Sequence, residues 1–181
     1  MQDTIPVKYN TNRFRSSLEA WGKDLRFWMR FPTRQGEVVT VKTAVSAVSS
    51  DGAKLNMQEL EGKTFASLKA EGEKLWEGQL SKFKIEATPE QRETFYTSVY
   101  HAFLHPFIFQ DADGKFRELD KNIGQAEGFT NYTVFSLWDT YRALHPLFNL
   151  VQRDINADIV NSMLAHYDKS VEHMLPVWSF Y

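Results

Sequence analysis

The second half of the chain carries apolar residues at helix-like intervals, and residues 133–147 show this most clearly. In the run TVFSLWDTYRALHPL, the apolar positions flank Trp138, Asp139 and Arg142, which fall within one helical turn. The pattern predicts an amphipathic helix that begins after Ser136, and Pro146 either kinks this helix or starts a second one.

Residues 52–82 are also rich in helix-forming residues, with charges between apolar positions spaced three and four apart. This segment predicts one short helix followed by one long helix. Gly72 and Gly78 would each weaken the long helix by about 1 kcal/mol relative to alanine. A close contact with another helix would explain why glycine stands at both positions.

Two more helices have clear boundaries. Thr88-Pro89-Glu90-Gln91 combines an N-cap threonine, a proline at the first helical position and the glutamine of a capping box, so a helix starts there. It should run to about Leu104, because Pro106 ends it. A last helix is expected with Asp154 as its N-cap. Its apolar stripe is formed by Ile155, Ile159, Met163, Leu164 and Tyr167.

Alternation with period two, the pattern of a half-buried strand, occurs early in the chain, after a polar and irregular segment at 1–24. Residues 25–31 and 37–48 alternate in this way on either side of a turn at 32–36, so the sequence predicts a β-hairpin. Two strands alone are marginal in water. The hairpin should therefore belong to a larger sheet or pack against another element.

The segment 107–130 contains the run DADG at 111–114, which resembles the start of a calcium loop. An EF-hand loop needs glycine at its sixth position and glutamate at its twelfth, where this chain has Phe116 and Asn122. The sequence therefore favours a turn between two short extended segments, FIFQ and KFREL, followed by a loop at 124–128.

The composition of the 181 residues argues against several classes of function. A formal net charge of −2 without a Lys/Arg stripe argues against nucleic-acid binding. The absence of cysteine excludes disulfides, zinc–thiolate sites and cysteine nucleophiles. No apolar run approaches the roughly 20 residues of a membrane span, and no signal-peptide pattern stands near the first residue. A leader removed beforehand would leave no such trace.

His101 and His105 are candidates for metal binding, since they have the four-residue spacing of a helical ligand pair. Ala102 stands where the HExxH motif of zinc proteases requires glutamate. Two polar residues at the end of a helix are therefore the alternative to a zinc site.

Trp138, Asp139 and Arg142 have the chemistry of a sugar subsite. An indole stacks on the apolar face of a sugar ring, and charged groups hydrogen-bond its hydroxyls more strongly than neutral ones. The alternative is purely structural. Trp138 would then belong to the core, and Asp139 would complete the cap that Ser136 begins.

Five stretches of the chain together resemble glycoside hydrolase family 92, the calcium-dependent exo-acting α-mannosidases common in gut Bacteroidetes. They are FYTSVYHAFLHP at 95–106, DADGKFR at 111–117, YTVFSLWDTYRALHPLFNLVQ at 132–152, INADIVNSMLAHYDKS at 155–170 and MLPVW at 174–178. The run FSLWDTYRALHPL is the most specific part of the resemblance.

The resemblance implies a mostly α-helical chain with a small β remnant, as a piece of a two-domain enzyme. On the family's plan, residues 1–50 are the C-terminal part of an N-terminal β-sandwich. Residues 51–87 are then linker helices, and residues 88–181 are the first part of an (α/α)6 catalytic barrel.

The resemblance also implies the activity of the intact parent. That activity is removal of terminal α-linked mannose from N-glycans or mannans by inverting, calcium-assisted hydrolysis, in the periplasm or outside the cell. Trp138 and Asp139 are then expected to contact the mannose, with Arg142 as a weaker neighbour.

The family's general acid, its base and its calcium ligands lie in motifs beyond these 181 residues, so no catalytic or metal-binding residue is assigned here. The chain is therefore expected to be inactive alone, and its unpaired apolar helix faces would favour self-association. The alternative is a non-catalytic carbohydrate-binding or interaction protein on the same scaffold.

Overall fold

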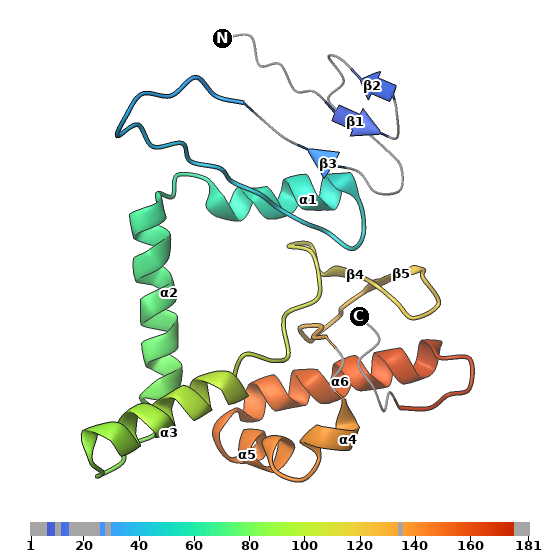
Figure 1. Ribbon diagram of the computed structural model, residues 1–181. Helices are drawn as coiled ribbons and strands as arrows, with labels where there is room; N and C mark the ends of the chain where they lie inside the picture. Colours follow the sequence, from blue (N-terminus) through green and yellow to red (C-terminus); the bar gives the residue numbers. More distant parts are fainter. Residues whose placement is uncertain (1–6, 10–11, 15–25, 28–29, 134–135, 176–181) are drawn as a thin grey trace. The chain divides into compact units, whose positions relative to one another are not determined.

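The computed structural model describes residues 7–9, 12–14, 26–27, 30–133 and 136–175, and it divides into two compact units, 1–41 and 42–181 (Figure 1). The first unit contains a three-stranded antiparallel sheet of β1 (Val7–Tyr9), β2 (Asn12–Phe14) and β3 (Arg26–Phe27). Its strand order is β2-β1-β3. Val7 is the central partner, since it pairs with Phe14 on one side and Phe27 on the other.

The predicted hairpin of 25–31 and 37–48 is wrong. β3 pairs with β1, and the described residues 37–48 contain no strand, although the turn between Arg34 and Gly36 is present, where Glu37 N–H donates to the Arg34 carbonyl. Residues 25, 28 and 29 lie outside the described part. The later half of the segment forms no ladder because its backbone oxygens accept side-chain donors instead. Asn56 Nδ2 donates to the Val45 carbonyl.

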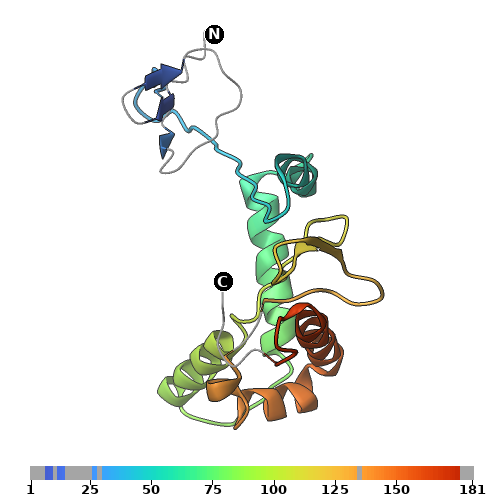
Figure 2. The ribbon, with the colours of Figure 1, turned by 90° about the vertical axis from the view of Figure 1, so that its right-hand side faces the viewer.

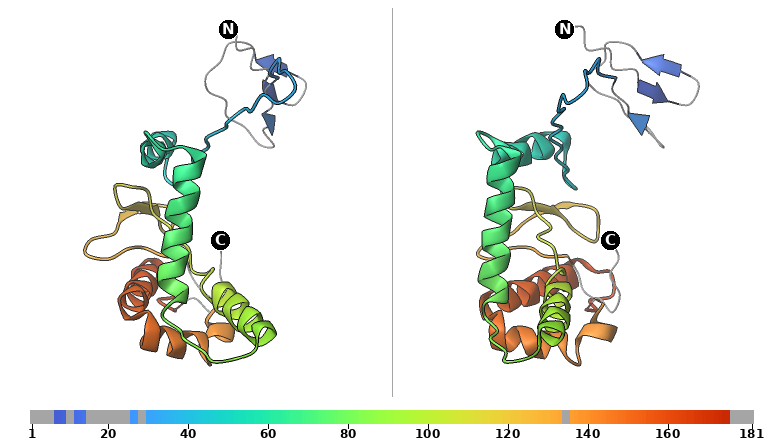
Figure 3. Two further views of the ribbon diagram at one scale, coloured as in Figure 1. Left: turned by 90° about the vertical axis from the view of Figure 1, so that its left-hand side faces the viewer. Right: turned by 60° about the vertical axis from the view of Figure 1, so that its left-hand side comes forward.

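The second unit is mostly helical, as the periodicity predicted. Its helices are α1 (Ser50–Met57), η1 (Gln58–Leu60), α2 (Phe65–Leu80), α3 (Pro89–Ala102), α4 (Leu137–Thr140), α5 (Leu144–Val151) and α6 (Arg153–Lys169). The predicted short and long helices of 52–82 are α1 and α2. In Figures 2 and 3, α1 lies near the first residues of α2, and α3 and α5 lie near its last residues.

The helix ends follow local chemistry at some positions and long-range contacts at others. The capping box at Thr88 and Gln91 is confirmed, and α3 ends at Ala102, two residues before the predicted end. The prediction that Asp154 caps α6 is wrong, because Gln152 precedes the helix and Asp154 lies in its first turn. The Gln152 side chain bonds Gln79 of α2 and Lys82, two residues after that helix, so it is used in a long-range contact and not as a cap of α6.

A small two-stranded antiparallel sheet joins β4 (Lys115–Arg117) to β5 (Ile123–Gln125). The predicted turn before β4 is present, since Gly114 has a positive φ of 81° and its N–H donates to the Asp111 carbonyl. The prediction of a loop at 124–128 is wrong for its first two residues, which belong to β5. The FIFQ segment instead lies beside residues 131–133, with Ile108 bridged to Tyr132.

The buried apolar core of the second unit lies between α5 and α6. Phe148 and Ile159 form its centre, and the partly buried residues around them are Phe103, Tyr132, Leu144, Ile155 and Met163. On the other side of α6, Val160, Leu164 and Tyr167 remain exposed. None of the described helices has both the length and the apolar character that crossing a membrane requires. Self-association stays a prediction.

The two glycines of α2 have no close neighbour, contrary to the predicted helix contact. A Cβ added at Gly72 or Gly78 would meet no atom within 4 Å. Substituting alanine at either position should therefore raise the free energy of unfolding by about 1 kcal/mol, through helix propensity alone. Thermal unfolding followed by circular dichroism should show a rise of about 2–4 °C in Tm for each variant.

Gly62 is the matched control for these two glycines, because it also has no atom within 4 Å of an added Cβ but adopts a φ of +68°. Gly62→Ala should lower Tm, since an L side chain is strained in that conformation. Equal effects of alanine at all three positions would contradict the argument.

Candidate functional site

The three residues predicted to contact a sugar lie together on α4 and the turn that follows it. All three are exposed, and Trp138 is 66% exposed, so this indole is not a core residue within the described part of the chain. α4 is only four residues long. It ends at Thr140, and the next residue, Tyr141, is its C-cap. The segment therefore presents an indole, a carboxylate and a guanidinium on a short, open turn.

Asp139 is held by the residue that precedes the helix. The Ser136 hydroxyl donates to Asp139 Oδ2 at 2.9 Å, and Asp139 N–H donates to the Ser136 carbonyl at 3.1 Å. Ser136 is the N-cap residue of α4, but among the described residues its side chain makes no capping bond to an N–H of the first turn. This geometry fixes the carboxylate against its own helix, with the side chain still exposed.

Tyr141 is a neighbour that sequence reasoning missed. It lies three residues after Trp138, which places the two aromatic side chains on one face of the turn. Arg142 Nε donates to the Tyr141 hydroxyl at 2.7 Å, and its guanidinium carbon lies 5.4 Å from the ring centroid. The helical spacing from Trp138 was the signal that could have identified Tyr141.

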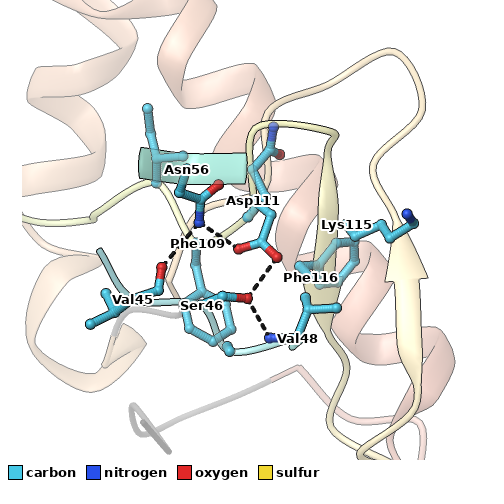
Figure 4. Close-up of a pocket in the computed structure, with 11 residues that line it drawn as sticks. Val45, Ser46, Val48, Asn56, Phe109, Asp111, Lys115 and Phe116 are labelled. Atoms are coloured by element: carbon cyan, nitrogen blue, oxygen red, sulfur yellow. Dashed lines mark hydrogen bonds between the residues drawn. The ribbon is translucent and has the colours of Figure 1, made fainter. Parts of the chain in front are cut away.

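A second polar cluster lies where the segment before α1 meets β4. We call Ser46, Asn56, Asp111 and Arg117 the Asp111 junction. Asp111 is only 4% exposed, and Figure 4 shows its carboxylate between the side chains of Ser46 and Asn56. Ser46 Oγ donates to Asp111 Oδ2 at 2.6 Å, and Asn56 Nδ2 donates to Oδ1 at 2.8 Å. The side-chain oxygen of Asn56, Oδ1, in turn accepts the Ala112 N–H at 2.8 Å.

Arg117 completes the Asp111 junction from β4. Its Nε donates to the Ala47 carbonyl at 2.6 Å, and its Nη2 donates to the Val48 carbonyl at 3.0 Å. Its Nη1 donates to the Lys121 carbonyl at 2.7 Å, so one guanidinium ties two segments of backbone together. A cavity of about 130 Å³ beside the junction is lined by Val45, Ile108, Phe109 and Phe116 among others.

The Asp111 junction is built for structure. Both Asp111 oxygens accept hydrogen bonds from the protein, and the Ser46 oxygen accepts the Val48 N–H at 2.9 Å as well as donating. A carboxylate bonded in this way stabilises the packing of the two segments that it joins.

The described residues contain no cluster of side chains typical of a metal site. Within this part of the chain, no three side chains of His, Cys, Asp or Glu lie close enough to hold an ion together. His105 packs its ring against Phe107, with the ring centroids 4.3 Å apart. The described residues therefore offer no cluster of such side chains for the calcium that the resemblance implies.

His166 is the most buried titratable side chain of α6. It is fully buried and packs edge-on against Phe116, with ring centroids 6.2 Å apart. Burial lowers the pKa of the His166 imidazole, because the charged form loses its hydration. The neutral form is therefore favoured, as expected of a residue that packs the β4 sheet against α6.

Comparison with known proteins relates this fold to carbohydrate-cleaving enzymes. The sequence model of the glycosyl hydrolase family 92 catalytic domain matches residues 52–181. The α-mannosidase BT3965 of Bacteroides thetaiotaomicron, a family 92 enzyme, is 64% identical over 98% of the chain, with a TM-score of 0.93. A second structure of BT3965 contains mannoimidazole and matches with the same identity and TM-score. No curated protein matches the chain.

Two more distant structures agree. The family 92 glycosyl hydrolase ccman5 is 26% identical over 67% of the chain, with a TM-score of 0.64. The family 92 inverting mannosidase BT2199 of Bacteroides thetaiotaomicron VPI-5482 is 22% identical over 97% of the chain, and its TM-score of 0.76 shows a shared fold.

These matches place the chain in the class of glycosyl hydrolases. More particularly, the chain belongs to glycosyl hydrolase family 92. The resemblance read from the WDTYR region and its neighbours is confirmed. The chain covers 25% of one BT3965 structure, 17% of ccman5 and 24% of BT2199, so it spans about a quarter or less of the proteins it matches.

Proposed function

We propose that this chain is part of an α-mannosidase that removes terminal α-linked mannose from N-glycans or mannans outside the cytoplasm. The observation that carries the proposal is the 64% identity to the α-mannosidase BT3965 over 98% of the chain. Identity at this level across nearly every described element supports a shared role for the segment. The inverting character of BT2199 supports single displacement for this enzyme as well.

The role that we assign to the chain within the enzyme is one wall of the mannose subsite. Trp138 would stack on the apolar face of the sugar, and Asp139 would accept hydrogen bonds from its hydroxyls. Arg142 would lie at the edge, where its hydrogen bond to Tyr141 fixes its position. The wall orients the sugar but moves no proton, because acid–base catalysis needs a group within reach of the reacting oxygen.

The division of the parent is part of the same proposal. Residues 1–50 would belong to an N-terminal β-sandwich, 51–87 to linker helices and 88–181 to the first part of an (α/α)6 barrel. The remaining three quarters would supply the acid and the base of an inverting glycosidase, two carboxyl groups about 6.5–9.5 Å apart with a water between them. Calcium would also be bound there, so the 181-residue chain would be inactive alone.

A chimera tests the proposal directly. Residues 1–181 replace the matching quarter of BT3965, and release of 4-nitrophenol from 4-nitrophenyl α-mannoside is measured. We expect the chimera to hydrolyse the substrate at a rate within about tenfold of BT3965 itself, the positive control, and the isolated chain to show no turnover. A chimera with a cooperative melting transition but no activity would contradict the proposal and favour the non-catalytic carbohydrate-binding alternative. Turnover by the isolated chain would contradict its assignment as a subsite wall alone.

A further inference from the structure

A cleft of about 230 Å³ lies at the meeting point of three helices, away from the α4 segment. Its lining residues come from α2, from the C-cap of α3, and from the N-cap and first turn of α6: Leu75, Trp76, Gln79, Phe103, Gln152 and Ile155. None of them belongs to the proposed mannose subsite, so binding in this cleft does not depend on the role proposed for α4.

The walls of this cleft combine apolar surface with side-chain amides. Trp76 is partly exposed and packs against Tyr100, with ring centroids 4.4 Å apart, so its position is fixed. Phe103 packs against both Phe83 and Phe148. The cleft therefore has rigid aromatic sides, which a ligand can contact without ordering loose side chains.

The polar groups at the cleft form a chain of hydrogen bonds, and the amide N–H groups at the end of this chain have no protein acceptor in the described part of the molecule. Lys82 Nζ donates to Gln152 Oε1 at 2.6 Å, and Gln152 Nε2 donates to Gln79 Oε1 at 2.5 Å. Gln152 is only 7% exposed, so burial shields both of its hydrogen bonds from competition with water. Among the described residues, the Gln79 amide nitrogen donates to no protein acceptor, and it is available at the wall of the cleft.

We propose that this cleft is a non-catalytic binding site for a single neutral pyranose ring. The indole of Trp76 and the ring of Phe103 would contact the apolar faces of the sugar, as aromatic side chains do. The Gln79 amide would donate to a ring hydroxyl. A volume of 230 Å³ is below the usual range of about 300–1,000 Å³ for drug-sized ligands and suits one ring.

Other ligand classes fit the lining less well. A hydrocarbon would cover the spare Gln79 donors without bonding them, which costs free energy. An anion would meet no cationic side chain in the lining, because Lys82 is not part of it and already donates to Gln152 and to the Val151 carbonyl at 3.1 Å. A sugar ring has apolar faces and hydroxyls, and both kinds of group have partners here.

The test is a titration of the isotopically labelled 181-residue chain with methyl α-mannopyranoside, followed by NMR. We expect a dissociation constant of about 1–10 mM, which is ordinary for a single ring. The indole N–H signal of Trp76 and the amide signals of Gln79 and Gln152 should move together. Signals of Trp138 report the α4 subsite separately, so a failure there does not bear on the cleft.

Leu75→Trp is designed to fill the cleft without disturbing the fold, because Leu75 is 72% exposed. It should raise the dissociation constant measured at the cleft by at least about tenfold. Leu164→Trp makes the same substitution at an exposed position on α6 and should leave the dissociation constant unchanged. Cyclohexanol is the apolar comparison, and it should bind at least about tenfold more weakly than the sugar.

Three results would overturn the proposal. One is the absence of shifts at Trp76 and Gln79 up to about 100 mM sugar in a folded chain. Another is equal binding by wild type and Leu75→Trp, which would place the sugar elsewhere. The third is tighter binding of cyclohexanol than of the sugar, which would make the cleft an apolar contact surface.

Discussion

Replacing Asp111 by alanine is expected to lower the free energy of unfolding by about 3 kcal/mol. The substitution leaves the Ser46 hydroxyl and the Asn56 amide, both partly buried, without the carboxylate that accepts from both, and Asp111 itself is only 4% exposed. Each unsatisfied buried group costs roughly 1–3 kcal/mol. Thermal unfolding should therefore show Tm lower by about 6–12 °C.

Asp113→Ala is the matched control for Asp111→Ala, because it removes a carboxylate two residues away that is exposed and pairs with Lys115 at 2.6 Å. Ion pairs of this kind contribute little to stability. Its effect on Tm should be much smaller. Equal losses from the two variants would show that burial and bonding of Asp111 are not what stabilises this region.

Gly52→Ala should disturb the same junction from the other side. A Cβ at this position would lie 2.0 Å from Asp111 Oδ2 and 2.7 Å from Ser46 Oγ, so the carboxylate and the hydroxyl could not keep their places. The two substitutions should therefore not be additive. In a double-mutant cycle, Gly52→Ala should cost much less when Asp111 is already alanine.

The second large effect is expected at Asp139, in the chimera with BT3965. Asp139→Asn keeps the size of the side chain and a weaker bond from Ser136 but removes the charge. Hydrogen bonds to charged groups contribute about 1.5–3 kcal/mol, so kcat/KM for the mannoside should fall roughly 10- to 150-fold. Steady-state kinetics gives this ratio, and thermal unfolding should show little change in Tm.

Asp154→Asn is the control for Asp139→Asn, since Asp154 is also an acidic residue in the first turn of a helix. Neutralising it removes a favourable interaction with the helix dipole and should leave kcat/KM unchanged. If Asp139→Asn instead lowers Tm while the folded chimera keeps its full kcat/KM, Asp139 acts only as the partner of Ser136, and its role in the subsite is wrong.

Local chemistry determined which elements could be predicted. The start of α3 depends on Thr88 and Gln91, which lie within one turn of each other, so the sequence contains the whole interaction. The segment 37–48 was mispredicted because alternation reports only that alternate side chains differ in polarity. Its carbonyls at Val45, Ala47 and Val48 accept from Asn56 and Arg117, and no pattern within the segment indicates those partners.

In the candidate site, too, residue type and spacing could be read from the sequence, whereas contacts between distant residues could not. Trp138 and Arg142 could be singled out from residue type and spacing. The Asp139 carboxylate was expected to accept from the backbone N–H of Ser136, but it accepts from the Ser136 hydroxyl, because a serine offers both donors. The cleft at Trp76 could not be predicted at all, since its lining residues span positions 75 to 155 and meet only in the folded chain.

The Asp111 junction also has a consequence for the order of events in folding. Its bonds join residues far apart in sequence: 65 positions for Ser46 and Asp111, 55 for Asn56 and Asp111, and 70 for Ala47 and Arg117. The entropy lost in closing such a loop grows only slowly with its length, and most of it is lost when the first of these bonds forms. The others then add at little further entropic cost, so the junction should form and melt as one cooperative unit, with the helices α1, α2 and α3 enclosed in the loop that it closes.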